Sequence, residues 1–219
     1  MSRIDCTKRT NLELLLGTHN PGKASEISRA LSGLGIHFLT LEDFPQVQTV
    51  RESGETYEEN AILKAKAYAQ QCGLWTLADD SGLEVMALDG APGVLSARYA
   101  GAAASDSNRI AFLLEALARR STSNRVARFT SVVALVDAHS RVINVEYGLC
   151  EGTIIDSPRG NHGFGYDPIF VPQGFDDTFA ELSSETKDAI SHRGKALQAM
   201  RHFLGQLIAS NLTPGLSNS

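Results

Sequence analysis

The sequence predicts an α/β fold in which helices flank a mixed sheet, part of it a long antiparallel pair. In the first half of the chain, short apolar runs alternate with amphipathic helical patterns, which is typical of strands joined by helices. Two long apolar stretches then follow, and only the link 138–140 separates them, which predicts a hairpin. Sheets of this kind bind ligands at strand ends, where loops meet helix N-termini.

The first predicted elements are a buried strand over 12–16 and a capped helix. Asn20 is suited to cap this helix, and Pro21 is suited to begin its first turn because proline lacks the N–H that would go unpaired there. The run 36–41 predicts a second strand. The apolar stripe of the helix consists of Ile27, Leu31 and Leu34.

An irregular, acidic loop over 42–54 precedes the second helix. Thr56 and Glu59 have the spacing of a capping box, in which each side chain accepts a hydrogen bond from the other residue's backbone. We expect the helix to continue to about Cys72, because Gly73 is suited to end it.

The middle of the chain predicts two short strands and a further helix. Residues 79–82 are polar and include a glycine, so we expect them to interrupt an extended segment. The strands on either side are 75–78 and 83–86. Asp106 is expected to cap the helix that follows. The apolar stripe of this helix consists of Ile110, Leu113, Leu114 and Leu117.

The last part of the chain predicts a hairpin, a loop and a C-terminal helix. The hairpin strands are expected over 126–137 and 141–153, and a glycine-rich loop over 156–167 follows them. The final helix is expected to begin after Ser191. Its apolar face consists of Leu197, Met200, Leu204, Leu207 and Ile208.

Length and composition indicate one globular domain. The chain has 219 residues, of which 42% are hydrophobic and 21% charged, and we expect one domain of two lobes over 12–208 between flexible termini, 1–11 and 209–219. The net charge of −5 argues against a protein that binds duplex nucleic acid. Three widely spaced cysteines indicate neither disulfides nor zinc. With no apolar leader or membrane span, a cytoplasmic protein is expected.

The segment 18–23 joins the first strand to the first helix and is a candidate phosphate site. Helix N-termini present free N–H groups and partial positive charge, and Lys23 adds a full charge. The alternative is a simple capped turn, since no Walker motif is present. The candidate substrate-binding residues here are Thr18, His19, Asn20, Pro21, Gly22 and Lys23.

Asp79 and Asp80 are adjacent carboxylates after an apolar strand. Neighbours in an extended chain point to opposite sides, so we expect only one of them to face a cleft, where it could bind a hard cation such as Mg²⁺. The alternative is a polar turn. Lys64 lies on the second helix, one turn after Asn60, and either points into the same cleft or belongs to a solvated charged face.

Two further segments suit a nucleobase. In the loop 160–168, an aromatic side chain could stack on a base and Asp167 could accept from ring N–H groups, although the aromatics could equally fill the core. Lys187, His192 and Arg193 supply donors that match the oxygen at position 6 of hypoxanthine or xanthine and reject the amino group of adenine. The alternative is an ordinary basic helix start.

Six motifs occur in an order and spacing that resemble the inosine triphosphate pyrophosphatase family, also called dITP/XTP pyrophosphatases. The resemblance runs from about Leu12 to Leu207, nearly the whole chain. Single motifs are weak, but all six in order are specific. They are Thr18-x-Asn20-x-x-Lys23, Glu59-Asn60-Ala61-x-x-Lys64-Ala65, Ala78-Asp79-Asp80-Ser81-Gly82-Leu83, Gly90-Ala91-Pro92-Gly93-x-x-Ser96-Ala97-Arg98-Tyr99, Gly163-Phe164-Gly165-Tyr166-Asp167-Pro168 and Ser191-His192-Arg193-Gly194.

The resemblance implies two lobes with a nucleotide in the cleft between them, a homodimer, and Mg²⁺-dependent hydrolysis of non-canonical purine nucleoside triphosphates (ITP, dITP, XTP). It implies Glu52 and Asp80 as metal ligands, and Asp80 also as the base that activates water. The implied catalytic residues are Asp80, Lys64 and Lys23. The implied substrate contacts beyond the phosphate segment are Ser81, Phe164, Gly165, Tyr166, Asp167, Lys187, His192 and Arg193.

One departure from the family pattern is His19, which stands where a small residue is expected. Three other hypotheses remain open at this point. They are a pyrophosphatase for other modified nucleotides, a nucleotide-binding sensor without turnover, and an interaction protein. Retention of both Glu52 and Asp80 favours the enzyme over the sensor.

Overall fold

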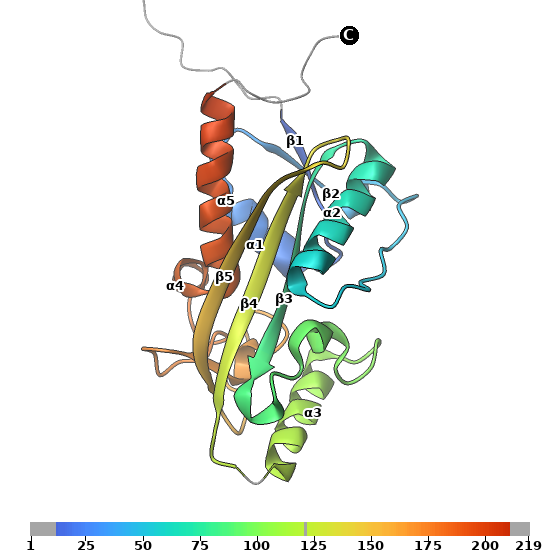
Figure 1. Cartoon of the computed structure of the whole chain (residues 1–219). Coiled ribbons are helices and arrows are strands. Elements are labelled where there is room, and N and C mark those ends of the chain that lie inside the picture. Colours follow the sequence, from blue (N-terminus) through green and yellow to red (C-terminus); the bar gives the residue numbers. More distant parts are fainter. Residues whose placement is uncertain (1–11, 121, 211–219) are drawn as a thin grey trace, which may run out of the picture.

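The computed structural model describes residues 12–120 and 122–210, so the predictions for the termini 1–11 and 211–219 lie outside the described residues (Figure 1). Its six-stranded sheet has the order β2-β1-β3-β4-β5-β6. β1 pairs parallel with β2 and β3, and the other pairs are antiparallel, which confirms the predicted mixed sheet. The strands are β1 (Glu13–Leu16), β2 (His37–Thr40), β3 (Trp75–Val85), β4 (Val126–Val136), β5 (Val142–Ile154) and β6 (Phe170–Pro172).

The longer helices form because each has a cap and an apolar face that packs against the sheet. Asn20 and Ser191 cap their helices, Thr56 forms the predicted capping box, and Gly73 ends its helix in the left-handed conformation. The α-helices are α1 (Pro21–Ala30), α2 (Tyr57–Cys72), α3 (Asp106–Arg119), α4 (Ser184–Ile190) and α5 (His192–Ala209). Short 3₁₀ helices are η1 (Leu41–Asp43), η2 (Met86–Leu88), η3 (Gly93–Arg98) and η4 (Asp167–Ile169).

The prediction that residues 79–82 break the extended segment is wrong. β3 runs unbroken from Trp75 to Val85, because β4 offers it a continuous antiparallel partner from Val136 to Ala127. Backbone pairing therefore overrides the turn propensity of a polar, glycine-containing segment. Position 82 requires a glycine, because η3 packs so closely against the strand that a Cβ there would collide with the carbonyl oxygen of Gly93.

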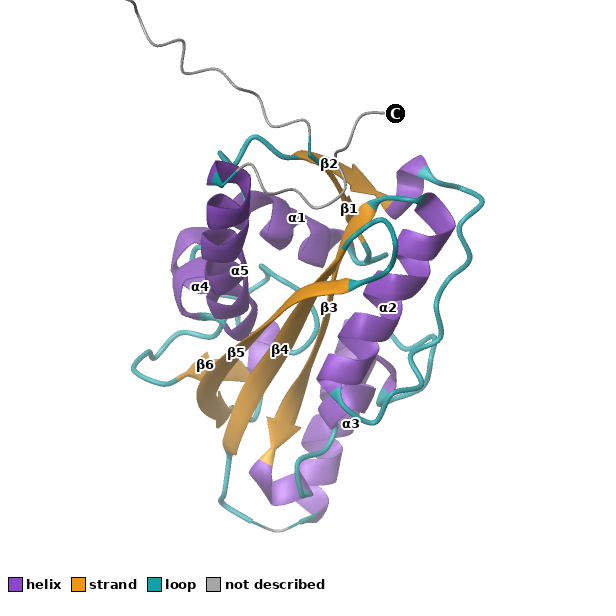
Figure 2. Ribbon diagram, turned by 45° about the horizontal axis from the view of Figure 1, so that its top comes forward, coloured by secondary structure: helices purple, strands orange, loops and turns teal. Residues whose placement is uncertain are grey.

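The long strands β3, β4 and β5 join two core regions, as Figure 1 shows. At one end, α1 and α5 pack on one face of the sheet and α2 on the other (Figure 2). At the other end, α3 packs with the far halves of β3, β4 and β5 and with the segment around η4. The space between the two core regions is where a ligand site is expected.

Smaller differences have local causes. Ser105, not Asp106, caps α3, and Asp106 occupies the first helical position. Sequence reasoning missed β6 and α4, which are too short, at 3 and 7 residues, for a periodic pattern to reveal them. Within the part of the chain that the structure describes, no helix has the length and apolar character needed to cross a membrane.

Candidate active site

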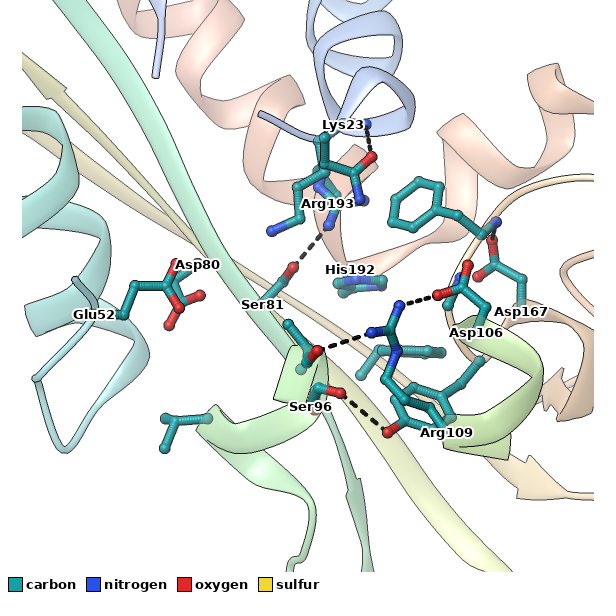
Figure 3. A pocket seen from close by; sticks show the side chains of 18 residues that line it. Lys23, Glu52, Asp80, Ser81, Ser96, Asp106, Arg109, Asp167, His192 and Arg193 are labelled. Atoms are coloured by element: carbon teal, nitrogen blue, oxygen red, sulfur yellow. Dashed lines mark hydrogen bonds and ion pairs between the residues drawn. The ribbon is translucent and has the colours of Figure 1, made fainter. Parts of the chain in front are cut away.

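A cavity of about 120 Å³ lies between the two core regions. Its walls come from distant parts of the chain: the N-terminus of α1, the middle of β3, η3, α3, the loop before η4 and the N-terminus of α5. Figure 3 shows Glu52 and Asp80 on one side of it and Asp106, Asp167 and His192 on the other. The predicted site residues that line it are Asn20, Lys23, Glu52, Asp80, Ser81, Phe164, Gly165, Tyr166, Asp167, His192 and Arg193.

Asp79 and Asp80 point to opposite faces of β3, as the strand geometry predicts. Ala78, two residues before Asp80, packs on α2, whereas Leu77, two residues before Asp79, packs with α1 and α5. Asp80 lines the cavity, and Asp79 lies buried beneath it. The two carboxylates consequently have entirely different partners.

Glu52 and Asp80, here called the carboxylate pair, share one ammonium group. Lys64 Nζ lies 2.5 Å from Glu52 Oε1 and 3.3 Å from Asp80 Oδ1. Burial disfavours the charged form of Lys64, but Asp80 and the other carboxylates around it outweigh burial and raise its pKa. Burial raises the pKa of Asp80 above its ordinary value, although Lys64 opposes the rise. Lys64 is thus buried against two residues of the cavity wall and is not part of a solvated face, although it does not line the cavity itself.

The carboxylate pair fits a hard divalent cation. The Oδ2 atom of Asp80 is buried and has no hydrogen-bond partner among residues 12–120 and 122–210. In the same described ranges, no group of three or more His, Cys, Asp or Glu side chains is arranged to hold a metal. Two carboxylates suffice for Mg²⁺, which keeps several waters and takes further ligands from substrate phosphates. Glu52 and Asp80 would be its protein ligands.

The N-terminus of α1 forms a wall of the cavity away from the carboxylate pair. Asn20 Oδ1 accepts from the backbone N–H of Lys23 at 3.1 Å, so the cap itself uses one of the N–H groups predicted to bind phosphate. The Lys23 ammonium lies 3.1 Å from Asp79 Oδ2. Burial lowers the pKa of Lys23, although Asp79 opposes this. A charged donor therefore reaches the cavity from α1, as predicted.

The other residues of the segment 18–23 lie behind this wall. Thr18 Oγ1 accepts from the backbone of Asn20, and Pro21 begins the helix. His19 packs edge-on against Tyr68. Gly22 packs against the ring of Phe164, from which a Cβ here would lie only 2.5 Å away.

Arg193 is the centre of a buried charge network. Its guanidinium donates to Asp79 Oδ2 at 3.1 Å, to Glu26 Oε2 at 2.5 Å and to Ser81 Oγ at 2.7 Å. Burial disfavours the ionised form of Asp79, but Lys23 and Arg193 outweigh it and hold the pKa far below its usual range. The network consists of Lys23, Glu26, Asp79, Asp167, Lys187 and Arg193.

Lys187 does not line the cavity and lies at the far end of this network. Its ammonium contacts Glu26 Oε1 at 2.9 Å and Asp167 Oδ2 at 2.6 Å, and it sits 4.9 Å from the centre of the Phe164 ring. Burial opposes its charge, but the two carboxylates prevail and raise its pKa. Asp167 also accepts from the backbone N–H of Phe164 at 2.9 Å, so it fixes the loop around this aromatic ring.

His192 forms part of the apolar side of the cavity. Its ring stacks on Phe129 with centroids 4.6 Å apart and an interplanar angle of 8°. Its Nδ1 is buried without a hydrogen-bond partner in the described part of the chain. Burial, reinforced by Arg193, lowers its pKa well below the ordinary value, so the ring is neutral. A neutral imidazole with a free nitrogen is suited to a hydrogen bond with a bound heterocycle.

Phe164 and Tyr166 have different tasks. Phe164 lines the cavity, and Arg193 lies 5.4 Å from the centre of its ring. Tyr166 is almost fully buried in the second core region and donates its hydroxyl to the carbonyl oxygen of Ser96 at 3.0 Å. Burial raises the pKa of this phenol, which stays protonated. Phe164 is thus the ring available for stacking, while Tyr166 anchors the loop.

Sequence reasoning missed three side chains of this site. Glu26 bridges Lys187 and Arg193, yet an acidic residue on a helix is usually solvated, and only its position one turn after Lys23 hinted at the cavity. Asp106 and Arg109 both line the cavity from the first turn of α3. In the sequence, Asp106 is recognisable only as a candidate helix cap, and no local signal marks Arg109.

Comparison with known proteins agrees with this arrangement. The model of the Ham1 family matches residues 14–203. A dITP/XTP pyrophosphatase from Exiguobacterium sp. is 47% identical over 189 residues, which cover 86% of this chain and 95% of that protein. One from Geobacter sulfurreducens is 47% identical over 192 residues, covering 88% and 96%.

Solved structures of Ham1 proteins are similar to this chain in fold and in sequence. A HAM1 protein from Coxiella burnetii superposes with a TM-score of 0.81 at 44% identity, covering 89% of this chain and 99% of that one. The Staphylococcus aureus Ham1 protein superposes with a TM-score of 0.78 at 39% identity, covering 89% and 98%. With sequence, fold and cavity residues in agreement over nearly the whole length, this chain belongs to the Ham1 family.

Proposed function

We propose that this protein hydrolyses non-canonical purine nucleoside triphosphates (ITP, dITP and XTP) to the monophosphate and pyrophosphate. Relatives named dITP/XTP pyrophosphatase share 47% identity with it over 86% to 88% of its length. The observation that carries the proposal is the cavity itself. It places the carboxylate pair opposite Phe164, His192 and Arg193, which suit a base. Such activity would remove deaminated purines from the nucleotide pool.

The chemistry follows from the two sides of the cavity. A water molecule attacks the α-phosphorus, the bond from this atom to the bridging oxygen breaks, and pyrophosphate leaves with the bonding electrons. Asp80 accepts the proton of the attacking water. Lys23 and Lys64, held by Asp79 and the carboxylate pair, stabilise charge on the leaving pyrophosphate.

Mg²⁺ is the proposed cofactor, with Glu52 and Asp80 as its protein ligands. When bound, it would neutralise phosphate oxygens and favour deprotonation of water. The buried, unpartnered Oδ2 of Asp80 and the position of both carboxylates at the cavity wall support this assignment. A bound cation also favours the ionised form of Asp80, which burial alone disfavours.

Base recognition is assigned to the opposite side. Phe164 would stack on the purine, and the neutral ring of His192 would bond to its edge. Lys187 and Arg193 supply the cations at this end, and Glu26 and Asp167 hold them in place. Donors directed at position 6 accept the oxygen of hypoxanthine or xanthine and leave the adenine amino group unpaired.

A homodimer in the cytoplasm completes the proposal. Val145 faces α2, so alternation along β5 places Tyr147 and Leu149 on the same face near the N-terminus of that helix. Tyr147 and Leu149 are 55% and 38% exposed, and exposed apolar side chains of this kind suit contact with a second copy. Sedimentation of the parent and of Leu149→Asp tests this assignment. The free cysteines Cys72 and Cys150 fit a reducing compartment.

The decisive experiment is pyrophosphate release from ITP, dITP, XTP, ATP, GTP, CTP and UTP with Mg²⁺, and again with EDTA. We expect metal-dependent release from the first three and little from ATP and GTP. Equal activity on all triphosphates would leave the phosphate chemistry intact and contradict the base assignment. No release from any of them would contradict the proposed activity.

A further inference from the structure

The loop that carries Phe164 has a backbone that packing alone does not fix. Gly163 and Gly165 flank the ring with φ of +76° and +63°, in the left-handed region where glycine is favoured. Phe164 also borders three cavities, of about 120, 410 and 210 Å³. Gly22, Lys187 and Arg193 contact the ring itself, and polar contacts to its loop restrain the backbone on the sides where the cavities leave space.

Two carboxylates hold consecutive backbone N–H groups of this loop. Asp167 belongs to the loop itself and accepts from Phe164 N at 2.9 Å. Asp106 comes from the first turn of α3 and accepts from Gly165 N at 2.7 Å through its Oδ2 atom. Since Asp106 and Gly165 lie 59 positions apart, this second bond ties the loop to another part of the fold.

Arg109 holds Asp106 in turn. Its guanidinium donates to Oδ1 of Asp106 and to the carbonyl oxygens of Ala97 at 2.9 Å and Ala104 at 2.7 Å. A planar guanidinium presents its N–H groups in fixed directions, which suits it to bridge three acceptors. Ala97 belongs to η3, which packs against β3 close to the carboxylate pair. The contacts thus connect the two sides of the cavity.

We propose that Asp106 and Arg109 are positioning residues that hold Phe164 in place for stacking on the nucleobase. Both side chains lie at the cavity wall, where Figure 3 shows them directed at each other. Their hydrogen bonds go to the protein, so they act through the loop and not on the phosphates. This inference rests on the proposed function, because it requires a base to stack there.

The test compares Asp106→Ala and Asp106→Asn with the parent, using dITP and Mg²⁺. Loss of a charged acceptor for a backbone N–H should raise KM for dITP roughly 10-fold or more, with kcat nearly unchanged. Asparagine retains an acceptor oxygen, so its KM should fall between the two. Hydrogen exchange of the backbone over 160–168 should be faster in Asp106→Ala. A base-free analogue, deoxyribose 5-triphosphate, should be hydrolysed equally by all three.

Glu115→Ala is the matched control. Glu115 lies on the same helix and pairs with Arg119 at 2.6 Å, but both side chains are exposed and neither lines the cavity. Equal KM values in Asp106→Ala and Glu115→Ala would overturn the inference, as would unchanged exchange over 160–168. If the parent released no pyrophosphate from dITP, the proposed function would be contradicted instead, and the exchange rates would still decide whether Asp106 fixes the loop.

Discussion

The carboxylate pair and the buried charge network lie on opposite faces of the same strand, and they differ in how closely their charges are paired. Glu52 and Asp80 share the ammonium of Lys64, which lies 3.3 Å from Asp80, and Glu52 also meets the guanidinium of Arg98 at 3.5 Å. In the network, three carboxylates meet three cations, with ion-pair distances of 2.5 to 3.1 Å. The carboxylate pair is the more open of the two: the Glu52 side chain is 24% exposed, whereas that of Asp79 is fully buried between Lys23 and Arg193.

This difference separates binding from architecture. Carboxylates that line a cavity and are only loosely paired can take up a cation or a proton, so they suit a metal and a general base. A balanced, buried cluster is costly to disturb, because removal of one member leaves an unpaired charge in a low dielectric. Adjacent residues of β3, Asp79 and Asp80, therefore make different contributions: one to stability and one to the reaction.

The largest expected effect is that of Asp80→Asn on turnover. The amide cannot accept the proton of the attacking water and is a poor cation ligand, so kcat for dITP should fall about 10³-fold. Stability should be kept or increased, because burial disfavours the ionised carboxylate of Asp80 in the folded protein and the amide carries no charge. Steady-state kinetics and thermal unfolding measure the two quantities. Near-normal turnover would show that Asp80 is not the base.

Asp79→Asn should have the converse result. It leaves the ammonium of Lys23 and the guanidinium of Arg193 without their shared carboxylate, at a cost of about 3–5 kcal/mol of unfolding free energy. Urea or thermal unfolding measures this loss. The matched control is Asp89→Asn, which breaks an exposed ion pair with Arg120 and should leave Tm unchanged. Equal Tm values for both variants would remove the contrast between the two faces of β3.

Much of this site could be predicted from the sequence, because side-chain alternation and helix capping depend only on residues close together in the chain. The alternation of Asp79 and Asp80, the cap at Asn20 and the mixed sheet all follow from short-range pattern. The unbroken course of β3 did not, because its cause is a partner strand some fifty positions away. The role of Gly22 depends on the Phe164 ring, which reaches it only in the folded chain.

The same limit applies to the partners of charged side chains. Glu26, Asp106 and Arg109 look like ordinary helix residues in the sequence. Glu26 and Asp106 are important because they contact residues 59 to 167 positions away. Arg109 is important because it donates to the carbonyl oxygens of Ala97 and Ala104. The resemblance to a family supplied residue roles but not these contacts. Long-range polar pairs therefore form the part of the site that required the structure.

A smaller effect is expected for Glu52→Gln, which removes one carboxylate of the pair and leaves Asp80 in place. The Mg²⁺ concentration for half-maximal activity should rise roughly 10- to 100-fold or more. This range is typical for loss of an outer-shell partner of a metal site, and loss of a direct ligand should cost at least as much. At saturating Mg²⁺, kcat should recover most of its parent value. Titration of activity with Mg²⁺ measures both. An unchanged titration curve would mean that Asp80 binds the cation without Glu52.

The smallest effect concerns His192, whose pKa the network helps to depress. Burial and the nearby cations keep the folded ring neutral, whereas the unfolded ring protonates near its ordinary pKa of about 6.5. The contribution of the neutral His192 ring to the free energy of unfolding is therefore complete above pH 6.5. It is lost as the pH falls from 6.5 toward the pKa of the folded ring, because the unfolded state then binds more protons than the folded state. NMR titration of the ring, with unfolding by urea between pH 7 and pH 5 for the parent and His192→Gln, measures both quantities. The variant should lose less stability on acidification, and equal losses would show that the network exerts no such influence on the base side of the cavity.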